Sequence, residues 1–214
     1  LQDVPVAVSV LSGDTLSAIT STGSDVRALS GRVPSLNIES SFGRTFPRFY
    51  IRGLGNTDFD LNASQPVSVV YDDVVLENPI LKGFPIFDLD RVEVLRGPQG
   101  TLFGRNTPAG IVKFDTVRPG KTGGYARVSY GRYGTSQVEV AAGAADDNGF
   151  SVRLSTLFQH RDDWVDNVAT TAKKDLGGYD DIAARLQLQY ESGPFTGRVT
   201  GQVRIYDGSA IIFR

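Results

Sequence analysis

The sequence predicts an α+β region followed by a set of antiparallel β-strands, and three observations support this fold class. Short extended runs and brief helical turns alternate up to about residue 120. A segment rich in glycine and proline interrupts them after Arg96. Beyond Gly124, five runs alternate apolar and polar residues with a period of two, which is typical of strands with one apolar and one polar face.

Composition limits the classes of function that fit. The chain has 214 residues, of which 40% are apolar, so a buried core is feasible. The formal net charge of −2, from 22 basic and 24 acidic residues, argues against a nucleic-acid-binding protein, because neutralising phosphates needs a basic excess. The absence of cysteine excludes disulfides and thiolate metal sites. No apolar run reaches the roughly 18 residues of a transmembrane helix.

The first 40 residues predict short elements in quick succession. We expect a strand at 4–11, a brief helix at 15–20, a helical turn at 26–30 and extended chain at 33–38. Residues 12–14 offer a turn and an N-cap for the helix, and Asp25 caps the helical turn.

The middle of the chain predicts strands separated by polar loops. Residues 49–55 read as a strand that ends in a turn, and residues 67–76 as a hairpin around Asp72 and Asp73. The segments 40–47 and 56–66 are rich in turn formers and predict loops. Residues 78–87 predict another irregular connection, because two prolines and a glycine interrupt them.

A strand is predicted at 88–96, and it stops at Gly97-Pro98, because proline fixes its own φ and offers no amide donor. Three further glycines up to Gly110 predict a compact knot of turns rather than a helix. The run 91–104, RVEVLRGPQGTLFG, closely resembles the plug signature of TonB-dependent outer-membrane receptors. The segments VSVLSGDTL, DVRALSGRVPSLNI and IRGLG resemble plug sequences in the same order and spacing. Asp73 departs from the family, which often has glycine there, so we expect a strained turn or another turn type.

The resemblance implies an α+β plug domain at 1–120, followed at 121–214 by about five antiparallel strands of an incomplete transmembrane β-barrel. Loop lengths agree with this, because 144–149 and 191–194 are short whereas 161–178 is long and polar, as in barrels with short periplasmic turns. The apolar strand faces would then meet lipid. The polar faces would line the lumen with Arg153, Arg185, Gln187, Arg198 and Arg204. Tyr130, Tyr190 and Tyr206 fit an interfacial girdle or ordinary cross-strand packing.

Five strands cannot close a barrel of this family. Plugged transporters have about 22 strands, and an open edge leaves amide groups that hydrocarbon cannot satisfy. We therefore expect the chain to be an excerpt of a longer receptor, with the TonB box upstream of Leu1 and any secretory signal either removed or upstream as well. Expressed alone, it is expected to be insoluble or to behave as a folded plug with a loose tail.

By resemblance, the function would be ligand-gated, energy-coupled uptake of a siderophore–iron complex or another scarce nutrient at the bacterial outer membrane. The implied partners are the TonB–ExbB–ExbD complex, outer-membrane lipid and a small nutrient, either a siderophore or an oligosaccharide. No enzymatic step, cofactor, metal or nucleic acid is expected. The alternative is a soluble α+β ligand-binding domain whose antiparallel sheet packs on the first half, and an enzyme ranks third.

Two arginines precede glycines at strand ends. The resemblance implies that Arg52 and Arg96, with Gly53, Glu93 and Gly97, lock the plug to carboxylates on the barrel wall. Arginine suits this role because its planar fork binds carboxylates bidentately and stays charged. The simpler reading is a pair of surface arginines on turns.

By the same resemblance, ligand contacts are expected in the loops 42–46 and 57–64. The candidate residues are Phe42, Arg44, Phe46, Asp58, Phe59 and Asn62. The aromatic side chains could equally fill gaps beneath the loops.

Other chemical motifs are weak. No GxxxxGK[ST] phosphate loop occurs. His160 is the single histidine and reads as a residue of the barrel rim. The pair Asp58 and Asp60 and the group Asp162, Asp163 and Asp166 lack the spacing of a calcium loop, so they read as solvated loop charge.

Overall fold

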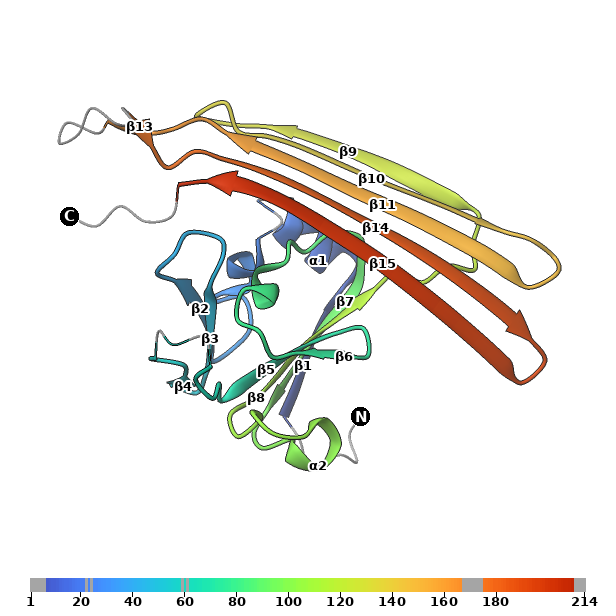
Figure 1. Cartoon of the computed structure of the whole chain (residues 1–214), viewed down its shortest axis with the longest axis horizontal. Coiled ribbons are helices and arrows are strands. Elements are labelled where there is room, and N and C mark those ends of the chain that lie inside the picture. Colours follow the sequence, from blue (N-terminus) through green and yellow to red (C-terminus); the bar gives the residue numbers. More distant parts are fainter. Residues whose placement is uncertain are drawn as a thin grey trace. The chain divides into compact units, whose positions relative to one another are not determined.

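The computed structural model describes residues 7–21, 23, 25–58, 60, 62–166 and 175–209. The chain divides into two compact units, Leu1–Thr116 and Val117–Arg214 (Figure 1). Each unit has a five-stranded sheet of its own. No described helix is long and apolar enough to cross a membrane.

The described residues of the first unit form two sheets and four short helices. Its main sheet has the order β1 (Ala7–Ser12), β7 (Leu89–Arg96), β8 (Gly110–Thr116), β5 (Val67–Tyr71) and β6 (Val74–Leu76). The smaller sheet has the order β2 (Leu36–Ser40), β3 (Pro47–Ile51) and β4 (Leu54–Gly55). The helices are α1 (Gly13–Thr20), η1 (Val26–Leu29), η2 (Leu81–Gly83) and α2 (Gly100–Phe103). Only β5 and β8 pair in parallel; the other described pairs are antiparallel.

The core of the first unit lies around the parallel pair. Every residue of β5 is buried, including the polar Ser68, so both faces of this strand are covered. Phe114 of β8 and Val94 of the adjacent strand β7 are at most 1% exposed. Helix α1 adds Leu16 and Ile19 to the same cluster. This unit therefore has the ordinary arrangement of a globular domain, with apolar side chains inside.

Several local expectations needed correction. The chain turns at 31–35, where Ser35 has φ of 63°, so the second strand begins at Leu36 instead of near residue 33. The predicted knot after Gly97 contains one helical turn, α2, which is four residues long and ends before Gly104, where φ is 75°. The acidic hairpin turn agrees with expectation, because Asp72 has a positive φ of 52°, as a strained turn requires.

The second unit is a single meander. Its strands are β9 (Gly123–Tyr130), β10 (Ser136–Ala145), β11 (Phe150–Arg161), β14 (Tyr179–Ser192) and β15 (Phe195–Gly208). Each pairs antiparallel with its neighbours in this order, and Figure 1 shows them as one continuous sheet of long strands. The fold class is confirmed, because a mixed α+β unit precedes an open antiparallel sheet. The connection 161–178 also holds two short strands, β12 (Val165–Asp166) and β13 (Asp175–Leu176), which pair with each other and were not predicted.

Candidate functional site

The first functional feature is an apolar surface on one face of the second sheet. In β14, Ile182, Leu186 and Leu188 are 37–46% exposed, whereas the alternate residues Arg185 and Gln187 are fully buried. The same face also carries Val128, Val138, Val140, Phe150, Leu154, Phe158, Tyr190, Val199, Val203 and Ile205, all classed as exposed. Soluble monomers rarely expose a contiguous apolar patch of this extent. The geometry therefore suits contact with lipid.

The opposite face of the same sheet is a network of paired polar side chains. Arg204 binds Asp181 through two contacts, Nε to Oδ1 at 2.8 Å and Nη2 to Oδ2 at 2.7 Å. Glu139 accepts hydrogen bonds from Arg127 and from the hydroxyl of Tyr125. A bidentate charged pair is geometrically specific, so the polar side chains of this face are fixed by contacts with one another and not only by water.

The register settles which side chains share the polar face. Arg153 lies opposite Gln187, and Arg198 opposite Gln189. The five residues expected on this face, which are Arg153, Arg185, Gln187, Arg198 and Arg204, all lie on it. The side chain of Gln187 also donates from Nε2 to the carbonyl oxygen of Val117 at 3.0 Å, so the sheet holds the start of its own unit.

The predicted lock residues lie at strand ends of the first unit. Arg52 and Gly53 have φ of 53° and 80°, which is the geometry of a two-residue hairpin turn with both central residues left-handed. Arg52 is exposed, and no bond of its guanidinium is found within the described residues. Gly97 has φ of 110°, a conformation that a side chain would strain.

Arg96 and Glu93 are engaged within the first unit. Arg96 donates from Nη2 to Ser9 Oγ at 3.1 Å and from Nε to the Ala7 carbonyl oxygen at 3.3 Å, which ties the edge strand β1 to β7. Glu93 pairs with Arg91 at 2.8 Å. Arg52 is therefore the arginine of the predicted lock whose side chain is open to an outside partner, and the lock itself stays a prediction.

The loop 42–46 is held from beneath by buried side chains. Phe46 is 5% exposed and its ring meets that of Phe42 edge-on at 5.8 Å. The side chain of Arg44 is 7% exposed and pairs with Asp25 at 3.2 Å. Phe46 therefore fills space beneath the loop, which is one of the two positions expected for it, and Arg44 is interior because folding brings Asp25 to it. Phe42 is half-buried and stays a candidate for ligand contact.

The Asp25 carboxylate pairs with two arginines, Arg27 and Arg44, beneath the loop 42–46. Burial raises the pKa of Asp25, but the hydrogen bond from Arg27 and the charges of Arg44 and Arg27 outweigh it, and the pKa lies below its usual value. Asp25 also accepts the backbone N–H of Arg27 and so caps η1, as predicted. The carboxylate thus connects the start of η1 to the loop 42–46.

In the described residues of the loop 57–64, side-chain oxygens accept successive backbone hydrogen bonds. The backbone N–H groups of Asp58, Asp60 and Asn62 each bond the side-chain oxygen two residues earlier, at 2.9–3.0 Å. Asp58 and Asn62 are exposed and could meet a ligand. Phe59, the aromatic candidate in this loop, lies outside the described residues.

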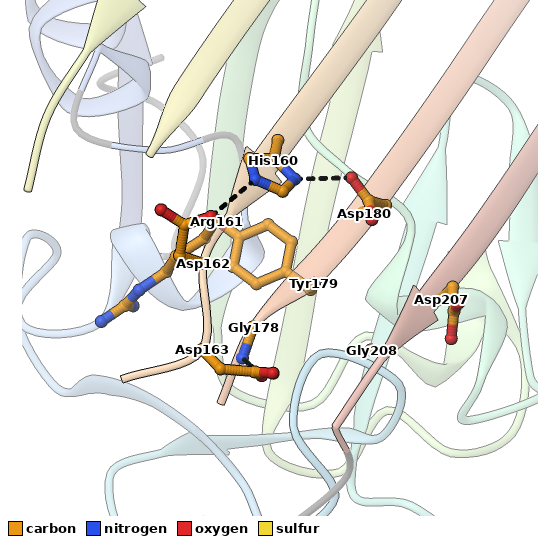
Figure 2. Close-up of a pocket in the computed structure, with 9 residues that line it drawn as sticks. All are labelled: His160, Arg161, Asp162, Asp163, Gly178, Tyr179, Asp180, Asp207 and Gly208. Atoms are coloured by element: carbon orange, nitrogen blue, oxygen red, sulfur yellow. Dashed lines mark hydrogen bonds and ion pairs between the residues drawn. The ribbon is translucent and has the colours of Figure 1, made fainter. Parts of the chain in front are cut away.

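A polar pocket of about 210 Å³ lies at the ends of β11, β14 and β15 (Figure 2). His160 lies between two carboxylates, with Nδ1 2.8 Å from Asp180 and Nε2 3.1 Å from Asp162. Asp163 and Asp207 add further carboxylates to the lining. The pocket suits a cationic or hydroxyl-rich group, since carboxylate oxygens only accept hydrogen bonds. Within the described part of the chain, no three histidine or acidic side chains are placed to hold a metal ion.

Sequence reasoning missed this pocket and one buried cation. The antiparallel register places His160 opposite Asp180, which lies twenty residues later in the sequence, and no local sequence pattern predicts that pairing. Lys82 is 2% exposed, and its Nζ donates to Gln65 Oε1 at 2.6 Å and to the Val67 carbonyl oxygen at 3.0 Å. The one sequence feature that could have indicated the burial of Lys82 is its position as the single charged residue in the mainly apolar segment ILKGFPIF.

Comparisons with known proteins agree with this geometry. The family model of the TonB-dependent receptor plug domain matches residues 1–111. Pesticin receptors of Yersinia enterocolitica and Yersinia pestis are 30% identical over 174 residues, which cover 81% of this chain and 25% of theirs. The chain therefore spans about a quarter of the length of the curated relatives it matches.

Solved structures share the fold. The ferric yersiniabactin uptake receptor FyuA from Yersinia pestis has a TM-score of 0.86 at 23% identity, over 96% of this chain and 32% of that one. The pyoverdine outer-membrane receptor FpvA from Pseudomonas aeruginosa has a TM-score of 0.72 at 14% identity, over 94% and 28%. At these identities the likeness concerns the fold alone.

Proposed function

Because the chain belongs to the family of TonB-dependent outer-membrane receptors, we propose that the protein carrying it takes up a ferric siderophore, or another scarce nutrient, across the bacterial outer membrane. Uptake is gated by ligand binding and coupled to energy through TonB, ExbB and ExbD. Residues 1–120 form the plug in this proposal, and residues 121–214 begin the barrel. Transport of this kind needs no covalent step, so no enzymatic activity is proposed.

The observation that carries the proposal is the reversed polarity of the second sheet. Its exposed face bears apolar side chains such as Phe158 and Leu186, and its other face bears paired charges such as Arg204 and Asp181. A soluble binding domain would need protein over the apolar face, whereas hydrocarbon covers it without further cost. The alternative of a soluble α+β binding domain is therefore set aside.

The choice of ligand class rests on the relatives and on the loops. One similar structure is a receptor for ferric yersiniabactin and another is bound to pyoverdine, and both ligands are siderophores. Phe42, Asp58 and Asn62 offer an aromatic ring and polar groups on two loops of the first unit. An oligosaccharide would use the same groups, so it remains the second ligand class to test.

The lock between plug and wall is part of the proposal. Arg52 is the arginine with an open side chain, and Gly53 and Gly97 allow the turns beside Arg52 and Arg96. Arg96 and Glu93 would have to exchange their present partners, Ser9 and Arg91, for groups on the wall.

Uptake by whole cells tests the function. A strain lacking the intact gene is complemented with it and supplied with ⁵⁵Fe as ferric yersiniabactin, ferric pyoverdine or ferric citrate under iron limitation. We expect one chelate to be accumulated only by complemented cells, and accumulation to stop when a protonophore removes the energy supply. Equal iron uptake by complemented and deleted strains for every chelate would contradict the siderophore proposal, and oligosaccharide uptake would then be measured in the same strains.

A further inference from the structure

The short helix η2 contacts the end of the loop 42–46 through Gly83. A Cβ atom on Gly83 would lie 2.7 Å from the Arg44 carbonyl oxygen and 3.1 Å from Pro47 Cδ. Gly83 has backbone angles that other residues also adopt, so the close approach of the loop is what excludes a side chain. The loop backbone therefore rests directly on η2.

The neighbouring residue, Lys82, holds the chain directly after the loop 57–64. Its buried ammonium group donates to the side chain of Gln65, immediately after the loop, and to the carbonyl of Val67, where β5 begins. An ammonium group only donates hydrogen bonds, so Gln65 must present its oxygen and turn its NH₂ group away. Within the described residues that NH₂ group has no hydrogen-bond partner. The side chain of Ser64 is held separately by Asn106 at 2.7 Å.

Charge agrees with this arrangement. Burial lowers the pKa of Lys82 to about 8, so the group is still mainly protonated at neutral pH. Because a buried ammonium must be matched by acceptors, loss of either the Gln65 side chain or the Val67 carbonyl as an acceptor would be costly.

We propose that Lys82 and Gly83 are positioning residues, which hold the loop 42–46 and the end of the loop 57–64, residues 62–64, at a fixed distance from each other so that the ligand meets a prepared surface. This inference rests on the proposed function, because it takes these two loops as the ligand loops. Holding a binding surface in its bound form raises affinity, since less conformational freedom is lost on binding. Neither residue touches the ligand in this account.

Distance measurements in the intact protein test the arrangement without any ligand. This chain has no cysteine, so once any cysteine elsewhere in the protein is replaced, spin labels at Ser41→Cys and Ala63→Cys report the distance between the two loops by pulsed electron paramagnetic resonance. We expect a narrow distribution in the otherwise unchanged protein. Lys82→Met and Gly83→Ala should each shift the distribution or broaden it roughly twofold, because one loop loses its anchor.

Two control variants separate positioning from stability. Gly100→Ala also adds a methyl group to a glycine of the first unit, but the nearest atom is Thr107 Oγ1 at 3.9 Å, so the distribution should not change. Val94→Ala removes core volume and should lower the thermal unfolding midpoint while leaving the loop distance unchanged. If Lys82→Met and Gly83→Ala change neither the centre nor the width of the distribution relative to the controls, the inference is overturned.

Binding is measured on the same variants with the ferric chelate that passes the uptake assay. We expect Lys82→Met and Gly83→Ala to weaken its affinity roughly tenfold, with Gly100→Ala near the parent value. A broadened distribution with unchanged affinity would support the anchoring of the loops but remove these loops from the ligand site. If no chelate is taken up, the distance result alone still decides the positioning role.

Discussion

The two units follow the same rule of strand alternation with opposite results. In the first unit apolar side chains such as Val94 and Phe114 lie inside. In the second unit Leu186 and Phe158 lie outside, while Arg185 and Asp181 are fully buried. The difference teaches that a period of two fixes which residues share a face but leaves open which face is enclosed. The surroundings of the sheet, and not its pattern, decide that.

The largest expected effect probes the core of the first unit. Replacing Phe114, which is 1% exposed, with alanine should lower the free energy of unfolding by about 3–5 kcal/mol, because it leaves a cavity among fixed neighbours. Hydrogen exchange of β7 and β8 amides in the intact protein reports the loss. A change below about 1 kcal/mol would mean that this region is loosely packed.

The second prediction probes the exposed face of the second unit. Leu186→Arg should lower stability in a bilayer by about 2–4 kcal/mol, because a charge would then face hydrocarbon. Thr200→Arg on the polar face is the matched control and should cost less. The measurement is reversible urea unfolding in lipid vesicles. If Leu186→Arg and Thr200→Arg lower the free energy of unfolding equally, the contrast between the two faces is wrong.

The third prediction uses pH on the first unit. The folded pKa of Lys82, about 8, lies below its usual value of 10.5, so the folded state binds this proton less tightly than the unfolded state. Burying the charged form of Lys82 therefore lowers the free energy of unfolding by its full amount below pH 8, and this cost disappears as pH rises toward 10.5. The free energy of unfolding should increase by up to roughly 3 kcal/mol across that window. Lys82→Met should flatten this rise when hydrogen exchange of β5 is followed against pH. An identical slope in both proteins would contradict the burial of the charge.

The smallest expected effects separate the two strand-end arginines. Arg96→Ala should free the edge strand β1 and lower its local stability by about 1 kcal/mol, because two hydrogen bonds are lost. Arg52→Ala should leave the stability of the first unit unchanged but weaken plug retention, seen as leakage of a large antibiotic into cells. Unchanged leakage and uptake in the double variant would refute the lock.

Most of the fold followed from local pattern, but the details of the site did not. The five strands of the second unit and the hairpin around Asp72 could be predicted, because alternation and turn chemistry are encoded within about ten residues. The burial of Arg44 could not, since its partner Asp25 is brought to it only by folding. The pocket around His160 depends likewise on register between strands.

The central claim is that one face of the second sheet meets lipid and the other does not. It is tested most directly by spin labels placed singly at residues 181–188 of β14 in the intact protein in lipid vesicles, with collision rates measured for oxygen and for a water-soluble nickel chelate. We predict high oxygen accessibility at the even positions, including Ile182, Leu186 and Leu188, and low accessibility to both reagents at the odd positions. Accessibility to the nickel chelate along the even positions, or no alternation at all, would contradict the claim.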